Sequence, residues 1–89
     1  MAANEEQIEA AIEEVLDERE RFVFEHCLGL GGNERHTNQE VSKMELPITK
    51  KRHRRRVGRE RIRQIRVRAT QKVLRTLRKK GHLDGTTNT

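Results

Sequence analysis

The sequence predicts an all-α fold of four helices in one small domain. Three helix-start signals, each a capping side chain with Gln or Glu three residues later, begin at Asn4, Asp17 and Thr37. Apolar residues recur at intervals of three or four in several segments, and no segment alternates as a strand does. The 89 residues are enough for a modest core. We therefore expect a domain over residues 1–81 and a disordered tail over 82–89.

The first two helices should follow each other closely. Helical spacing of apolar residues predicts the first over residues 5–16. The second should begin after Asp17 and end near Leu28, because Gly29 is a typical residue for ending a helix. Residues 29–36, which are rich in glycine, should then form a flexible loop.

The last two helices should differ in length. A short helix should open at Thr37 and end near Met44. A long amphipathic helix should run from about Gly58 to Lys80 and stop at Gly81, because apolar residues recur within it every third or fourth position. These apolar residues are Ile62, Ile65, Ala69, Val73 and Leu77. A short helix, a connection and a long polar-faced helix together predict a helix-turn-helix.

The two parts of the chain carry opposite charges. Residues 1–34 hold ten acids against Arg19 and Arg21, whereas residues 35–89 hold 18 basic and four acidic residues. A strongly basic segment favours a polyanionic partner. The acidic part would meet a basic protein or maintain solubility.

The outer face of the long helix carries side chains of the types that read DNA bases. Four of them lie opposite the apolar stripe: Arg59, Glu60, Arg63 and Gln64. Three cations lie on one flank, where phosphates would be: Arg61, Arg68 and Lys72. Arginine can grip guanine O6 and N7, glutamate can accept from cytosine N4, and glutamine can pair with adenine. A merely solvated face is the alternative, with Glu60 paired to Arg56 or Gln64.

Three segments, in this order, carry a resemblance to a known family: LDERERFVFEHCLGLGG (16–32), TNQEVSKM (37–44) and VGRERIRQIRVRATQKVLRTLR (57–78). They resemble region 4 of bacterial RNA polymerase sigma factors of the sigma-70 family, which is their C-terminal helix-turn-helix domain. The run RERIRQI is among the more specific short runs of that family. The resemblance implies a sequence-specific DNA-binding module of transcription initiation, located in the bacterial cytoplasm at the nucleoid.

The resemblance also implies roles for individual residues. Base edges of the minus-thirty-five promoter element would be read in the major groove by Arg59, Glu60 and Gln64. Arg63 would support a phosphate contact or reach a base as well. Phosphates of the double-stranded promoter DNA would be contacted by Thr37 and Arg61, with Arg68 on the same flank. The flap of the RNA polymerase β subunit would be bound by Phe22, Val23, Phe24 and Leu28. Core packing is the competing interpretation for at least half of these last four.

Residues 45–56, here named the insertion, depart from the family, which joins the two helices by a short turn. As a loop, the insertion would add roughly ten residues and a set of phosphate-seeking cations: Lys50, Lys51, Arg52, Arg54, Arg55 and Arg56. Alternatively, the long helix extends back to Thr49 and the turn moves to 45–48. Gly58 inside that longer helix would cost about 1 kcal/mol relative to alanine. This cost favours the loop.

Other kinds of chemistry find little support in the sequence. The four histidines are scattered, and Cys27, which we expect in the core, has only His26 beside it. We therefore expect no metal, no cofactor and no internal disulfide. No nucleophile accompanies a base, so we expect neither an enzyme nor a small-molecule substrate. No apolar run reaches the roughly 18 residues of a membrane span. A second hypothesis is an adaptor that binds RNA polymerase or a sigma factor without reading DNA.

Overall fold

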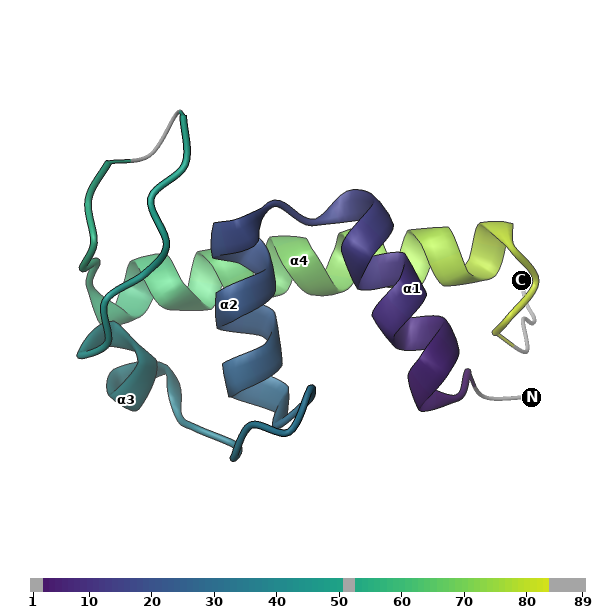
Figure 1. Cartoon of the computed structure of the whole chain (residues 1–89), viewed down its shortest axis with the longest axis horizontal. Coiled ribbons are helices and arrows are strands. Elements are labelled where there is room, and N and C mark those ends of the chain that lie inside the picture. The colour runs from purple at the N-terminus through teal and green to yellow at the C-terminus, as the bar shows by residue number, and fades with distance from the viewer. Residues whose placement is uncertain (1–2, 51–52, 84–89) are drawn as a thin grey trace.

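The structure, a computed structural model, describes residues 3–50 and 53–83. Within these ranges it contains four helices and no strand, so the expected all-α fold is confirmed. The helices are α1 (Glu5–Val15), α2 (Glu18–Leu28), α3 (Asn38–Ser42) and α4 (Arg59–Lys79). Helix α4 lies along the longest axis of the molecule (Figure 1). Helices α1 and α2 cross it, and α3 lies beside its first residues.

The first three helices begin at the capping boxes that the sequence predicts. The Asn4 side chain accepts from the Gln7 amide at 2.8 Å, and the Asp17 side chain accepts from the Glu20 amide at the same distance. The Thr37 hydroxyl accepts from the Glu40 amide at 3.1 Å. In each case the side chain at the third helical position accepts from the capping residue in return. Amides that lack a partner within the helix are satisfied in this way.

The helix ends differ slightly from the predicted ones. Helix α2 ends at Leu28 with Gly29 as its C-cap, as expected, and α1 ends one residue before the predicted end at 16. Helix α3 ends at Ser42 rather than near Met44. The Met44 amide there donates to the carbonyl three residues back, at 3.0 Å, so the last turn is tighter than an α-helical turn.

The core consists of two clusters that lie one after the other along α4. The first cluster joins α1, α2 and the second half of α4 through Ala11, Ile12, Phe24, Ala69, Val73 and Leu77. The second cluster joins α2, α3 and the first half of α4 through Val23, Cys27, Val41, Leu46, Ile62 and Ile65. Helix α2 contributes to both clusters. The first half of α4 is therefore held by α2, α3 and Leu46, independently of α1.

The insertion is a loop whose two ends are held together. Helix α4 begins at Arg59, with Gly58 as its N-cap, so the alternative of a helix from Thr49 is wrong. The Leu46 amide donates to the Arg55 carbonyl, and the Leu46 side chain is 1% exposed in the second core cluster. Arg19 of α2, which is 4% exposed, donates to the Arg54 carbonyl. These contacts fix the base of the insertion against α2.

The start of the C-terminal tail is packed rather than disordered. The His82 amide donates to the Leu77 carbonyl at 2.8 Å, after Gly81 has turned the chain with a φ of 76°. Leu83 packs against the first core cluster. The expectation of a disordered tail over 82–89 is therefore wrong for its first two residues. Residues 84–89 lie outside the part of the chain that is described.

Candidate nucleic-acid interface

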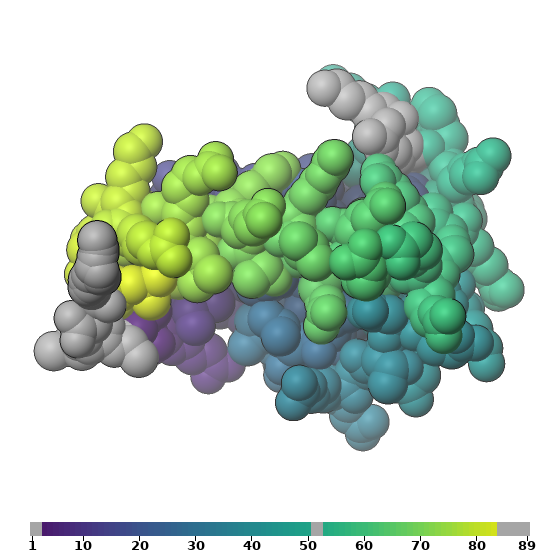
Figure 2. Space-filling model, turned by 180° about the vertical axis from the view of Figure 1, so that it is seen from behind, coloured from purple at the N-terminus to yellow at the C-terminus, as the bar shows by residue number. Residues whose placement is uncertain are grey.

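The candidate base-reading residues lie together on the outward face of α4. Figure 2 shows α4, green to yellow, exposed along the length of one face of the molecule. Arg59, Glu60, Arg63 and Gln64 are all exposed there. Ile62 and Ile65, on the opposite side of the helix, are buried at 0% and 6% exposure, and this packing sets the orientation of the outward residues. The structure thus brings together the four side chains that the helical spacing places on one face.

Glu60 and Arg63 form a close ion pair on this face. Their Oε2 and Nη2 atoms lie 2.6 Å apart, and Arg63 Nε donates to both carboxylate oxygens at 3.1 and 3.2 Å. These hydrogen bonds hold the pKa of Glu60 below its usual value, so the carboxylate is ionised at neutral pH. The alternative prediction from the sequence, in which Glu60 pairs with Arg56 or Gln64, is wrong, because Glu60 pairs with Arg63. Arg56 precedes the helix, and Gln64 instead accepts from Arg61 at 3.3 Å.

One flank of the outward face is formed by α3. Arg59 Nη1 donates to the Gln39 side chain at 3.5 Å, which links the starts of the two helices. Thr37 is exposed beside them, and its hydroxyl oxygen accepts from the Glu40 amide. Because the Thr37 hydroxyl acts there as an acceptor, its hydrogen is still available for donation to a phosphate oxygen.

Most of the other candidate phosphate-binding cations are exposed. Arg68 and Lys50 are exposed, and Arg61 is half-buried on the flank that faces the insertion. Arg55 lies 3.9 Å from Glu45, with both side chains 60% exposed, so this ion pair is weak and easily exchanged. Lys51 and Arg52 lie outside the described residues. The structure therefore gives no placement for those two cations of the insertion.

The acidic helices neutralise only part of α4. Glu20 of α2 contacts Lys72 at 2.6 Å, and Glu14 of α1 contacts Lys80 at 2.5 Å. Both cations belong to the second half of α4. Among the described residues, the only acid paired with a cation in the first half of α4 is Glu60, from the same helix. The printed contacts of the acidic helices α1 and α2 with α4 thus fall on its second half, away from the candidate base-reading residues.

Two of the four candidate polymerase-binding residues belong to the core. Val23 is 0% exposed and Phe24 is 3% exposed, one in each core cluster, so their assignment to a partner surface is wrong. Phe22 is half-buried and stacks on His26, with ring centroids 4.1 Å apart. Leu28 is 41% exposed at the end of α2. Only Phe22 and Leu28 remain accessible to a partner.

Sequence reasoning missed two residues that shape this region. Leu46 gave no periodic signal, although a lone leucine directly before Pro47 is a weak sign of an anchored turn. Arg19 is surrounded in sequence by acids, which gives no sign of burial, yet its side chain is buried against the insertion. Cys27 is a core residue, as expected, and burial raises the pKa of its thiol.

Several further properties of the described chain bear on its chemistry. No three His, Cys, Asp or Glu side chains within residues 3–50 and 53–83 lie close enough to hold a metal ion. No helix of that same part has the length and apolar character of a membrane span. Comparisons with models of known protein families, with curated protein sequences and with solved structures found no match.

Proposed function

We propose that this chain is a sequence-specific DNA-binding module of transcription initiation that reads the minus-thirty-five promoter element with α4. The observation that carries the proposal is the outward face of α4, where Arg59, Glu60, Arg63 and Gln64 are exposed together and little compensated by other acids. The resemblance of residues 16–78 to sigma region 4 supports the same function. In this proposal the module acts in the bacterial cytoplasm, on nucleoid DNA.

The geometry of α4 suits the major groove. That groove is about 12 Å wide and admits an α-helix whose buried side stays on the protein. The Glu60 carboxylate keeps lone pairs that can accept from cytosine N4 while it also accepts hydrogen bonds from the Arg63 guanidinium. A pre-positioned pair loses less side-chain entropy on binding than two free side chains do. Gln64 can pair with adenine from the same face.

Cations around this face would position the DNA without reading its sequence. Thr37 and Arg59 lie on the α3 flank, and Arg61, Arg68 and the insertion residues Lys50 and Arg55 are the other candidates. Contacts of this kind supply affinity that falls with salt concentration. We therefore assign base readout and phosphate contact to different side chains, and this division can be tested.

The test compares three single variants on a panel of duplexes that differ at one base pair each. Glu60→Ala and Gln64→Ala should each lose about 1–3 kcal/mol of discrimination at one position of the site. Arg55→Ala should weaken every duplex alike and reduce the slope of log K against log salt by about one. Fluorescence anisotropy at several salt concentrations measures both effects. Arg75→Ala, an exposed arginine in the second half of α4, is the charge-matched control.

Uniform weakening of all duplexes by all three variants would exclude base readout. The second candidate function, an adaptor that binds RNA polymerase or a sigma factor, is favoured by one observation. Exposed Leu28 lies with Val67 and Thr70 around an open pocket on the side of α4. In that case the chain would bind the isolated β flap in a pull-down and show no preference among the duplexes.

A further inference from the structure

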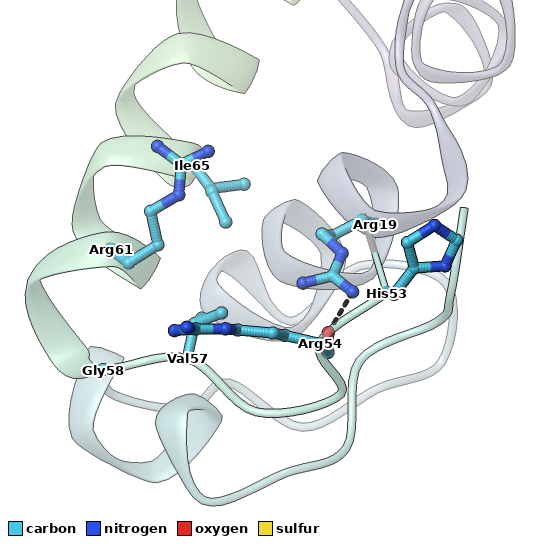
Figure 3. A pocket seen from close by; sticks show the side chains of 7 residues that line it. All are labelled: Arg19, His53, Arg54, Val57, Gly58, Arg61 and Ile65. Carbon is cyan, nitrogen blue, oxygen red and sulfur yellow. Dashed lines mark hydrogen bonds between the residues drawn. The ribbon is translucent and has the colours of Figure 1, made fainter. Parts of the chain in front are cut away.

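An open pocket lies between α2, the insertion and the start of α4. Its volume is about 590 Å³, and it is lined by Arg19, His53, Arg54, Val57, Gly58, Arg61 and Ile65. Figure 3 shows Arg61 on one side, Arg19 and His53 on the other, and Arg54 across the bottom. The volume is within the range of about 300–1,000 Å³ that is usual for small-ligand sites. The pocket is separate from the outward face of α4, because Arg59, Glu60, Arg63 and Gln64 do not line it.

The pocket concentrates positive charge. Three guanidinium groups and one imidazole line it, and none of its described lining residues is an acid. Like charges gathered around one cavity repel each other, and an anion placed among them relieves this repulsion.

The cationic groups are also held in place. Arg19 is 4% exposed, and its Nη2 donates to the Arg54 carbonyl, so its guanidinium cannot turn freely. The hydrogen bond from Leu46 to Arg55 closes the insertion one residue further on. Arg61 extends from the first turn of α4, and its Nη1 donates to the Gln64 side chain at 3.3 Å. A site whose groups are already positioned binds its ligand at a lower entropic cost.

We propose that this pocket binds the phosphoryl group of a nucleotide. Arginine side chains present planar sets of N–H donors that match phosphate oxygens, and the delocalised guanidinium is more weakly hydrated than an ammonium group. Val57 and Ile65 add an apolar wall on which a base or sugar can rest. The phosphoryl group could belong to a free nucleoside phosphate or to a nucleic-acid strand. The pocket would then be a second site beside the base-reading face, and Arg61 is the lining residue that it shares with the candidate DNA phosphate contacts.

The experiment titrates the full chain with ADP and with pyrophosphate, by calorimetry and by NMR of the amides of residues 53–61, without DNA present. We expect saturable binding at one site, with shifts centred on Arg54 and Arg61. Arg54→Gln and Arg61→Gln should each weaken binding at least tenfold. Both side chains lie at the surface of the pocket, and the Arg54 carbonyl that accepts from Arg19 is retained in the variant.

Arg75→Gln removes the same charge from an exposed position of α4 outside the pocket, and it should change the dissociation constant less than twofold. Competition by a short duplex would assign the phosphoryl group to nucleic acid, and its absence would assign it to a free nucleotide. Equal weakening by all three variants, or no saturation with either probe, would overturn the proposal. Neither result depends on whether α4 reads a promoter.

Discussion

Gly29 determines at the scale of one residue how the chain leaves α2. It adopts a left-handed backbone conformation with a φ of 73°, and its amide donates to the Glu25 carbonyl. A Cβ atom at this position would lie 3.3 Å from both the backbone nitrogen and the Cβ of Arg35. Both the conformation and the close approach of the following loop therefore favour glycine.

Gly29→Ala should lower the free energy of unfolding by about 1–2 kcal/mol, because a residue with a Cβ is strained in this conformation. Urea denaturation followed by circular dichroism measures the change. Gly32→Ala is a matched control, since Gly32 has a φ of 80° and open space around it. It should carry the conformational cost without the contact with Arg35. The explanation fails if Gly29→Ala is as stable as Gly58→Ala, where φ is −71° and nothing lies nearby.

Single-residue roles could be predicted where they depend on neighbours in sequence. The three capping boxes need only side chains three residues apart, so the sequence sufficed for them. For the run Phe22-Val23-Phe24, the sequence could not show in the same way which residues are buried and which are accessible. Successive helical residues point about 100° apart, and three apolar neighbours leave the buried pair undecided. Only the packing of α4 and α1 against α2 places Val23 and Phe24 inside.

At the scale of one element, the start of α4 is weakly capped. Gly58 is its N-cap and provides no side-chain hydrogen bond, in contrast to the caps of the other three helices. Its φ of −71° and ψ of 165° suit any residue, and a Cβ would meet no atom within 4 Å. A capping side chain can therefore be added here without strain.

Gly58→Ser and Gly58→Asp should each raise the free energy of unfolding by a few tenths of a kcal/mol, because serine and aspartate are better N-caps than glycine. The two variants should differ in DNA binding. Aspartate places a negative charge beside the candidate phosphate-binding cations, so Gly58→Asp should bind DNA more weakly than Gly58→Ser at low salt. Denaturation curves and anisotropy titrations of both variants provide the measurement. Equal DNA affinity of the two variants would argue against a phosphate contact near the start of α4.

The extent of α4 could be predicted because its apolar residues repeat regularly from Ile62 to Leu77. The shape of the insertion could not. Its base is closed by contacts to the carbonyls of Arg54 and Arg55, and a backbone carbonyl is present at every residue. A hydrogen bond of this kind leaves no signal in the amino-acid sequence. The cationic pocket could not be predicted either, since it brings Arg19 against residues that lie 34 or more positions further along the chain.

On the scale of the whole molecule, Leu46 links the insertion to the core. Leu46→Ala should lower the free energy of unfolding by about 2–5 kcal/mol, as is usual for a leucine removed from a packed core. Leu74→Ala is the control, because Leu74 is 36% exposed on α4 and should change stability by about 0.5 kcal/mol or less. Urea denaturation compares the two. Similar small losses for both would mean that the second core cluster does not depend on Leu46.

The distribution of charge also belongs to this scale. The sequence predicts an acidic N-terminal part and a basic C-terminal part. In the structure, the acidic helices α1 and α2 contact the second half of the basic helix α4 through Glu14 and Glu20. The opposition of charges in sequence therefore becomes an asymmetry along α4. The sequence could not predict which half of α4 the acidic side chains of α1 and α2 neutralise. That depends on how these two helices cross α4 (Figure 1).

The closed base of the insertion allows the length of the insertion to change. Leu46 and Arg55 are joined directly, so the geometry of α3 and α4 does not depend on how many residues lie between these two. For a flexible loop, each doubling of length costs only about 0.6 kcal/mol. The stretch 48–52, which stops before the pocket residues His53 and Arg54, is thus a natural site for length polymorphism, and for grafting a foreign peptide or a reporter tag. The helices on either side would retain their arrangement.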